Sequence, residues 1–391
     1  MMTMEQNIDL KNLDKANWKS FRFDKIAKKI SETVKPDETE VDVYVGLEHI
    51  DPEDIHIRRK GVPSDVKGGK LRCYPGDVIF GKRRAYQRKA AIVDFEGICS
   101  AHAFVFRANP KIIDPKLFPF FLHSNQFMHR MVDISVGGLS PTINWGDMKA
   151  QEFLLPPKDQ QAKLAELLWA MDEVVERENE VLEKLEVFRK IKINNFFNQR
   201  ESFQGYKKLG DVCNIERGGS PRPIDDYITD EDNGINWIKI GDVELESKYV
   251  TTTKQKIKPS GLNKTRRVYR GDLILSNSMS FGRPYILKID GCIHDGWLVI
   301  HDENNIFDKE YLYYYLNSDK IFNQFKKFAA GGVVNNLNKE IVKKLKVYTP
   351  PINNQIKMRK ELSFLDERNK LVKSKIQSSQ ALQKSLINQV F

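Results

Sequence analysis

The sequence is poor in cysteine and contains no long apolar run. Only four of its 391 residues are cysteines (Cys73, Cys99, Cys213 and Cys292), and no two of them form a CxxC pair. This spacing excludes a zinc ribbon or a dense disulfide framework and is typical of a reducing cytoplasm. No segment approaches the ~18 apolar residues of a membrane span, and residues 1–15 lack the apolar stretch of a secretory signal. We therefore expect a cytoplasmic protein with no membrane partner.

The motifs of the common enzyme sites are also missing. The sequence has no P-loop, no HExxH and no GxSxG, and its seven histidines show no metal-ligand spacing. The prolines at 156–157 and 350–351 are not preceded by the Asn or Asp of an adenine methyltransferase, and no Gly-rich cofactor loop comes before them. We predict that the chain has no catalytic residues, no cofactor and no metal of its own.

The sequence does contain an internal repeat with a spacing of about 194 residues. YPGDVIF at 74–80 returns as YRGDLIL at 269–275, and Gly137-Gly138 returns as Gly331-Gly332. LPP at 155–157 returns as TPP at 349–351. These matches keep one order and nearly one offset, whereas chance matches would scatter. So long a period excludes a solenoid and predicts two copies of one large module.

Each copy begins with a mixed α/β pattern and ends with a long helical one. Short β-type runs stand at 41–45, 78–80, 90–93, 104–107, 268–275, 285–289 and 297–300, and helical patterns at 117–132 and 311–328. A stretch without Pro or Gly follows each diproline, where proline favours a helix start. The predicted division is a globular domain at 1–157, a long helix within 158–200, a second globular domain at 201–351 and a second long helix at 352–391.

Apolar residues recur in both long stretches in steps of four and three, which is the pattern of a coiled-coil seam. The seam residues are Leu164, Leu168, Met171, Val175, Leu182 and Leu185 in the first stretch, and Met358, Leu362, Leu365, Val372, Ile376 and Leu386 in the second. Glu178 and Asn369 interrupt the seams, and such polar breaks tend to fix the register. We expect the helices to pair antiparallel, with the two globular domains related by a pseudo-two-fold axis. The alternative is that each helix packs on its own domain.

Positive charge is in excess and is locally concentrated. Lys and Arg number 63 against 53 Asp and Glu, a formal charge of +10 that suggests a polyanionic partner. Residues 82–89 hold five basic side chains, with Tyr86 and Gln87 between them and no acid. Such a run offers contacts to phosphates together with groups that reach base edges. The alternative is a solvated hairpin.

The second copy holds different side chains at the corresponding place, in SNSMSFGRPY at 276–285. A constant backbone frame with different side chains suits two domains that read two different ligands.

The loop at 217–222 has Arg at both ends and two glycines that favour backbone contact with phosphate. The Gly-Gly segments at 137–144 and 331–338 carry polar side chains. A plain structural turn is the alternative for each of these loops. The candidate DNA-binding residues are Lys82, Arg83, Arg84, Tyr86, Gln87, Arg88, Ser140, Thr142, Arg217, Ser220, Arg222, Ser276, Asn277, Ser278, Ser280, Arg283, Tyr285 and Asn335.

These motifs resemble the DNA-specificity subunit of type I restriction-modification systems. The resemblance rests on YVGLEHI at 44–50, the run 74–90, EGICS at 96–100, the segments 269–275 and 276–285, and the two proline-led helix starts. It covers essentially the whole chain. It implies two target recognition domains that read the halves of a split, asymmetric double-stranded DNA sequence, and an antiparallel coiled coil that spaces them.

The resemblance also implies protein partners. Two modification subunits, which bind S-adenosylmethionine and methylate adenine N6, dock on the helices, and a restriction (translocase-nuclease) subunit is able to join. The expected fold is α+β, with two globular α/β domains joined by two long helices. Two other readings stay open: a stand-alone enzyme that modifies DNA, and a coiled-coil scaffold that binds only protein.

Overall fold

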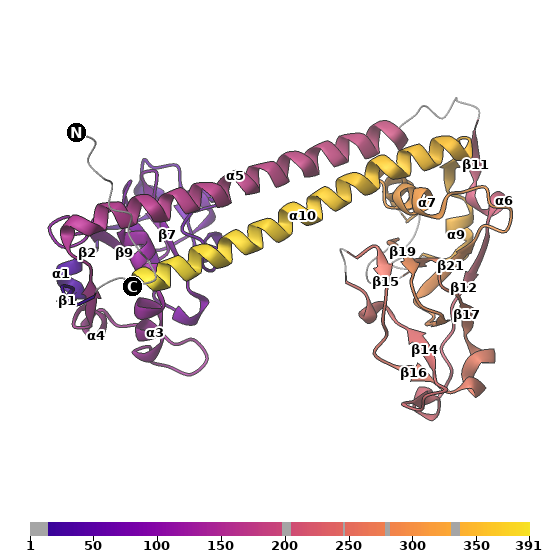
Figure 1. Cartoon of the computed structure of the whole chain (residues 1–391), viewed down its shortest axis with the longest axis horizontal. Coiled ribbons are helices and arrows are strands. Elements are labelled where there is room, and N and C mark those ends of the chain that lie inside the picture. Colours follow the sequence, from indigo (N-terminus) through magenta and orange to yellow (C-terminus); the bar gives the residue numbers. More distant parts are fainter. Residues whose placement is uncertain (1–14, 198–204, 245–246, 278–281, 330–336) are drawn as a thin grey trace. The chain divides into compact units, whose positions relative to one another are not determined.

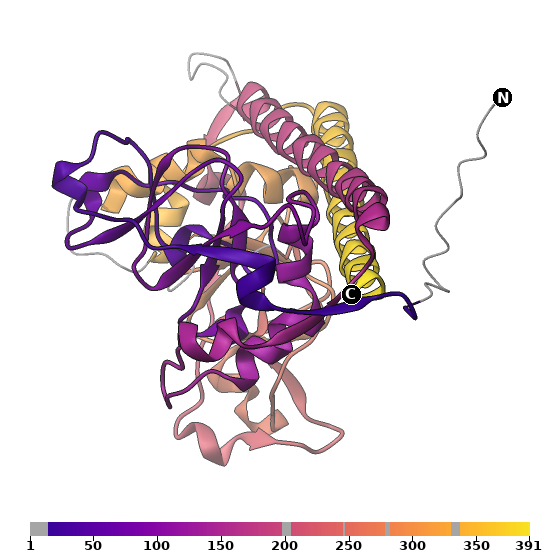
Figure 2. The same cartoon turned by 90° about the vertical axis from the view of Figure 1, so that its left-hand side faces the viewer.

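The computed structural model of the chain describes residues 15–197, 205–244, 247–277, 282–329 and 337–391, which form two compact units. Unit 1 holds the described residues up to Glu180 together with Lys373–Phe391, and unit 2 holds those within Val181–Val372. The long helices α5 (Lys158–Phe197) and α10 (Ile352–Val390) therefore each contribute one part to unit 1 and the other part to unit 2 (Figures 1 and 2).

Unit 1 contains three small sheets and four short helices. Strand β1 (Lys19–Arg22) pairs antiparallel with β10 (Glu152–Leu155). One four-stranded sheet has the order β2 (Ala27–Ile30), β9 (Ala103–Ala108), β6 (Val78–Gly81) and β7 (Ala90–Ile92). The other has the order β3 (Thr33–Val34), β5 (Lys70–Cys73), β8 (Gly97–Cys99) and β4 (Tyr44–Val45). The helices are α1 (Phe23–Ile26), α2 (Phe118–His123), α3 (Asn125–Asp133) and α4 (Trp145–Lys149).

Unit 2 repeats this plan with larger sheets. Strand β11 (Tyr206–Lys208) pairs with β22 (Lys346–Tyr348). One five-stranded sheet has the order β12 (Asn214–Arg217), β21 (Trp297–His301), β18 (Leu273–Ser276), β19 (Pro284–Leu287) and β15 (Tyr249–Val250). The other has the order β13 (Ile228–Thr229), β16 (Lys256–Ile257), β14 (Ile235–Ile238), β20 (Gly291–Ile293) and β17 (Arg266–Val268). The shorter helices are α6 (Leu209–Val212), α7 (Lys309–Leu316), α8 (Asp319–Ala329) and α9 (Lys339–Lys343).

The repeated YPGD and YRGD motifs form the same tight turn. Gly76 and Gly271 adopt φ values of 86° and 92°, a left-handed backbone that favours glycine. The Asp77 carboxylate accepts the Tyr74 N–H at 3.1 Å, and the Asp272 carboxylate accepts the Tyr269 N–H at 2.8 Å. Each turn leads directly into a fully buried strand, β6 or β18. The motif that reveals the duplication is thus a structural one.

The two long helices also begin alike. Gln161 donates its amide N–H groups to the carbonyls of Ile112 and Pro156, both at 2.9 Å, and accepts the Asp114 N–H at 2.6 Å. Gln355 does the same in unit 2, with the carbonyls of Ile306 and Pro350 at 2.9 and 2.8 Å and the Asp308 N–H at 2.9 Å. Both glutamines are only 1% exposed. Gln161 therefore ties the first turn of α5 to the loop before α2 and to the residue after β10. Gln355 ties the first turn of α10 to the loop before α7 and to the chain after β22 in the same way.

Within each unit the two long helices run antiparallel. In unit 1 Asp172 of α5 accepts a hydrogen bond from Gln383 at 2.9 Å, and Glu178 pairs with Lys375 at 3.3 Å. In unit 2 Arg189 contacts Asp366 at 2.6 Å, and Lys192 contacts Glu361 at 3.2 Å. Residue numbers therefore rise along α5 as they fall along α10.

The long helices also pack on the globular cores, so antiparallel pairing within each unit and packing on a core occur together. Every predicted seam residue is buried or half-buried. Leu164 and Leu168 belong to the aromatic-rich core of unit 1, which also takes in Val390 and Phe391 from the end of α10. Phe197 belongs to the core of unit 2. The expected α+β class, with two mixed domains and two long helices, is confirmed.

Several predicted elements have different bounds. The run 268–275 is not one strand, because the YRGD turn separates β17 from β18. The pattern at 117–132 is two helices, since Ser124 ends α2 and its hydroxyl accepts the Phe127 N–H as the cap of α3. The pattern at 311–328 likewise divides into α7 and α8. The four cysteines are free and buried. No helix in the described ranges is long and apolar enough to cross a bilayer.

Candidate nucleic-acid interface

In unit 1 two of the predicted segments lie against each other. The segment after β6 meets the Gly-Gly loop: the Arg84 N–H donates to the Pro141 carbonyl at 2.7 Å, and Arg84 Nε donates to Ser140 Oγ at 3.1 Å. Arg83 and Thr142 form a backbone bridge. The structure thus brings Arg83, Arg84, Ser140 and Thr142 together although they are about 60 residues apart in the sequence.

Two lysines extend this group. Lys82 and Lys29 stand over the ring of Phe104, at 5.2 and 5.7 Å from its centroid. Burial, and then the charge of Lys29, lower the pKa of Lys82. An anion bound here would relieve this repulsion. Sequence reasoning missed Lys29, because two lysines in a short strand carry no signal of their own. We call Lys29, Lys82, Arg83, Arg84, Tyr86, Ser140 and Thr142 the Arg84 surface.

The short 3₁₀ helix Ala85–Gln87 presents the exposed part of this surface. Tyr86 is 54% exposed, and Arg83 and Arg84 are also exposed. Arg84 and Arg88, on either side of the helix, adopt left-handed φ values of 56° and 52°, which are uncommon for residues other than glycine. Gln87 is half-buried between them.

Arg88 holds this turn in place and is a correction to the predicted set. Its guanidinium donates to the His123 carbonyl and to Asn125 Oδ1, both at 3.0 Å, and pairs with Glu53 at 2.9 Å. Only 17% of the side chain is exposed. A run of basic residues in the sequence does not reveal that Arg88 is mostly buried and paired, because its partners come from distant parts of the chain.

In unit 2 the predicted residues gather around Asp295. The Asp295 carbonyl accepts hydrogen bonds from Arg217 Nε at 2.9 Å and from Asn277 Nδ2 at 2.8 Å. Its carboxylate accepts the Ser220 hydroxyl at 2.9 Å. We call Arg217, Ser220, Arg222, Lys239, Asn277, His294 and Asp295 the Asp295 cluster.

His294 Nδ1 lies beside two polar groups at this cationic cluster. The Gly296 N–H donates to it at 2.9 Å, and Asp295 Oδ1 is also 2.9 Å from it. Burial is the main reason that the pKa of His294 is lowered; Asp295 opposes the shift, and Lys239, Arg222 and Arg217 add to it. Sequence reasoning did not single out Lys239 as a site residue.

The glycines of the 217–222 loop serve packing and not phosphate binding, which corrects one prediction. The N–H groups of Gly218 and Gly219 already donate to the Trp297 and Ile293 carbonyls, both at 3.0 Å. A Cβ at Gly218 would stand 2.2 Å from the His294 carbonyl oxygen. The loop therefore needs glycine to approach β20 closely, and the N–H groups of its two glycines are already used within the protein.

Three more predicted residues are buried. Ser276, Asn277 and Tyr285 are 0%, 3% and 1% exposed, because β18 and β19 are covered on both faces. Ser276 Oγ accepts the Arg283 N–H at 3.0 Å, and Tyr285 packs edge-on against Trp297. These residues position the site instead of forming its outer face, while Arg283 is exposed. Ser278, Ser280 and Asn335 lie outside the described residues.

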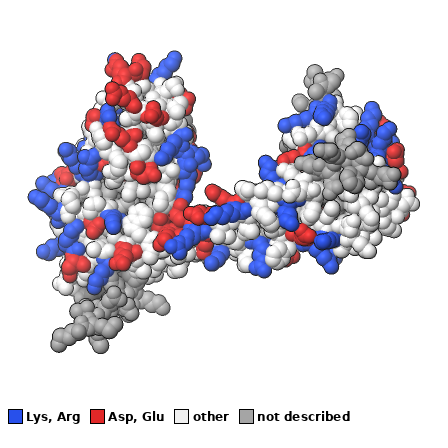
Figure 3. Space-filling view, turned by 90° about the horizontal axis from the view of Figure 1, so that it is seen from above, with Lys and Arg blue, Asp and Glu red and all other residues white. Residues whose placement is uncertain are grey.

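The segment after β6 and the segment after β18 meet the end of the Gly-Gly segment in the same way in the two modules. The Ile143 N–H donates to the Lys82 carbonyl at 2.9 Å in unit 1, and the Leu337 N–H donates to the Asn277 carbonyl at 2.8 Å in unit 2. On the face drawn in Figure 3, basic side chains are interspersed with acidic ones in both units. Local clusters, and not a uniformly basic face, are thus what each unit offers to an anion there.

A family model described as "Type I restriction modification DNA specificity domain" matches the chain twice, over residues 16–187 and 202–379. The chain belongs to this family. The Arg84 surface lies in the first specificity domain and the Asp295 cluster in the second. Family membership assigns the chain to DNA recognition in type I restriction-modification.

Relatives in this specificity family cover nearly the whole chain. The type I restriction enzyme MjaX specificity subunit of Methanocaldococcus jannaschii is 21% identical over 368 residues, 88% of this chain and 84% of the relative. A structure from a study of complex assembly and conformational transition of the type I restriction-modification system has a TM-score of 0.63 at 20% identity, covering 95% of this chain and 97% of that one. The S subunit from M. genitalium has a TM-score of 0.54 at 16% identity, with 100% and 98% covered. These two structures share the fold.

Proposed function

We propose that this chain reads a split, asymmetric DNA sequence, one half with each unit, and directs a modifying complex to it. The observation that carries the proposal is that two modules with one fold each hold a cluster of cationic and polar side chains, and that the two clusters differ. The Arg84 surface offers arginines and a tyrosine, whereas the Asp295 cluster offers arginines, a histidine and the Ser220 hydroxyl. Phosphate contacts supply affinity that falls with salt, and contacts to base edges supply the choice of sequence.

The chemistry belongs to partners in this proposal. Two modification subunits, holding S-adenosylmethionine, dock on the helices and methylate an adenine at N6. That adenine has to leave the base stack to be reached. This chain contributes position and performs no reaction itself. A restriction (translocase-nuclease) subunit joins where the host encodes one.

The experiment is a map of methylated adenines in cells that carry this chain with its modification subunit. Wild type should give one bipartite motif. Arg84→Ala should relax or lose the half read by unit 1, and Arg222→Ala the half read by unit 2, so each variant is the control for the other. A lost contact to a base edge costs about 1–3 kcal/mol at the affected position only. Loss of the same half in both variants would contradict the assignment.

Spacing is tested separately. We expect the helices to set the number of unread base pairs, because a helix advances about 1.5 Å per residue. Four residues inserted into α5, with four inserted opposite them in α10, should lengthen the gap in the methylated motif. An unchanged gap would refute this part of the proposal.

Two outcomes would favour the other readings. Methylation of DNA by the purified chain with S-adenosylmethionine would reveal a stand-alone enzyme. A reconstituted complex without any sequence-specific DNA binding would point to a scaffold that binds only protein.

A further inference from the structure

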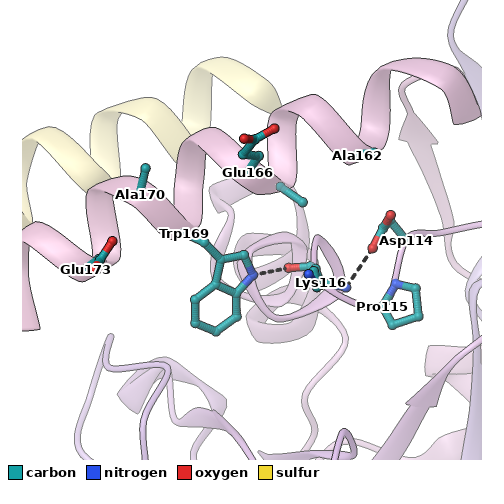
Figure 4. A pocket seen from close by; sticks show the side chains of 9 residues that line it. Asp114, Pro115, Lys116, Ala162, Glu166, Trp169, Ala170 and Glu173 are labelled. Carbon is teal, nitrogen blue, oxygen red and sulfur yellow. Dashed lines mark hydrogen bonds between the residues drawn. The ribbon is translucent and has the colours of Figure 1, made fainter.

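Unit 1 contains a groove along the first half of α5. It has a volume of about 940 Å³ and lies between α5 and the loop that precedes α2 (Figure 4). Ala162, Ala165 and Ala170 leave space along the helix, and Trp169 forms an apolar wall.

Trp169 is held rigidly. Its indole N–H donates to the Lys116 carbonyl at 2.8 Å, and its ring packs edge-on against Phe120 at 5.1 Å. The wall of the groove is therefore preformed, which lowers the entropy cost of binding.

The rim of the groove is acidic. Asp114, Glu166 and Glu173 line it together with one base, Lys116, so the lining carries a formal charge of −2, and Glu173 is also paired with Arg177 outside the lining. A DNA backbone would be repelled here. An apolar side chain flanked by Lys or Arg would be complementary to both floor and rim.

The matching place in unit 2 is filled. A shift of 194 residues places Arg359 at the position of Ala165 and Lys360 at that of Glu166. The Arg359 guanidinium reaches across to Asp308 at 3.4 Å and to Glu310 at 3.7 Å, between α10 and the loop before α7. The frame is the same, since Gln161 and Gln355 make equivalent hydrogen bonds. The two units differ here in the side chains that line the space.

We propose that the groove of unit 1 is a docking site for a basic, amphipathic segment of the modification subunit, and that unit 2 offers no equivalent site. The proposal rests on the proposed function, because it takes the modification subunit as the occupant. Its new content is that the two copies of that subunit bind unequally, one using the groove and the other not.

The test is a titration of the purified modification subunit into the full chain, followed by native mass spectrometry and calorimetry. Two binding steps of different affinity are expected. Glu166→Lys gives unit 1 the charge found in unit 2, and it should weaken the tighter step about tenfold or more by replacing attraction with repulsion. Lys360→Glu, the reciprocal change on α10, should leave that step unchanged.

A second pair of variants tests the volume of the groove. Ala170→Arg places a large cation in the groove at an exposed position, whereas Ala101→Arg adds the same side chain to an exposed loop of unit 1. Only Ala170→Arg should weaken the tighter step. Equal affinities for the two copies, or equal effects within either pair of variants, would overturn the proposal. Failure of the modification subunit to bind at all would refute the docking part of the proposed function as well, while the methylation map tests DNA reading independently.

Discussion

The glutamine at the start of each long helix provides the sharpest test of how the duplicated fold is held together. Replacing Gln161 by Leu keeps most of the side-chain volume but removes three hydrogen bonds. It leaves the carbonyls of Ile112 and Pro156 and the N–H of Asp114 without their partner. Each unsatisfied buried group costs about 1–3 kcal/mol. Because Asp114 is only half-buried and water can reach it, we expect a total loss of about 3 kcal/mol from unit 1.

This loss is large enough to measure unit by unit. For a unit of this size, about 3 kcal/mol corresponds to a fall of roughly 6–12 °C in the unfolding temperature. Scanning calorimetry should show that Gln161→Leu shifts one transition and Gln355→Leu shifts the other by a similar amount. Hydrogen exchange should show faster exchange of the Asp114 amide in the first variant and of the Asp308 amide in the second.

The neighbouring Gln160 is the matched control, because it is half-buried at the same helix start. Gln160→Leu should change the unfolding temperature by less than about 2 °C, since substitutions without a buried contact usually stay within ±0.5 kcal/mol. If Gln161→Leu were no more destabilising than Gln160→Leu, the view that this buried amide fastens the helix to its domain would be wrong.

Three further predictions each rest on contacts within one unit. Gly218→Ala should destabilise unit 2 by about 2 kcal/mol or more in urea unfolding, because a Cβ there would meet a carbonyl oxygen at 2.2 Å. Asp77→Ala should cost unit 1 about 2–3 kcal/mol, since this fully buried carboxylate binds the turn amide and the Arg107 guanidinium at 2.7 and 2.9 Å; a variant as stable as wild type would contradict the structural role of the YPGD turn. The hydrogen bond from His56 to Asp172 raises the pKa of His56 above its ordinary value, so the protonated form stabilises unit 1 below about pH 6.5 and this stabilisation is lost as pH rises through the folded-state pKa; the unfolding temperature of His56→Gln should lack that pH dependence.

The sequence was sufficient for the architecture because the duplicated positions are the ones that the backbone constrains most. A left-handed turn needs Gly76 and Gly271, and a helix start favours the diprolines. The same residues therefore stand at these positions in both copies, so the repeat can be recognised from the sequence alone. The heptad steps of the long helices are legible for a similar reason, since each seam residue packs against the partner helix or a core.

The candidate sites were predictable only in part. The basic run at 82–89 contributes to the Arg84 surface, and the loop at 217–222 contributes to the Asp295 cluster. Which of their side chains are exposed depends on tertiary packing. Ser276 in β18 was predicted to contact DNA, but it is buried because the strand is covered on both faces. Lys29 and Lys239 join the sites from elements that carry no motif. Periodicity gives no information about such neighbours, because they meet only after the sheets are formed.

The division of α10 between the units has a consequence for biosynthesis. The core of unit 1 includes Ile387, Val390 and Phe391, whereas the core of unit 2 takes Ile193 and Phe197 from a helix already made. During translation unit 2 therefore has all its pieces by the time residue 372 is extruded, but unit 1, although begun first, waits for its final strip until residues 373–391 emerge. The half synthesised first is thus the last to be completed, and a premature stop between residues 373 and 391 would remove part of the unit 1 core while leaving every residue of unit 2 in place.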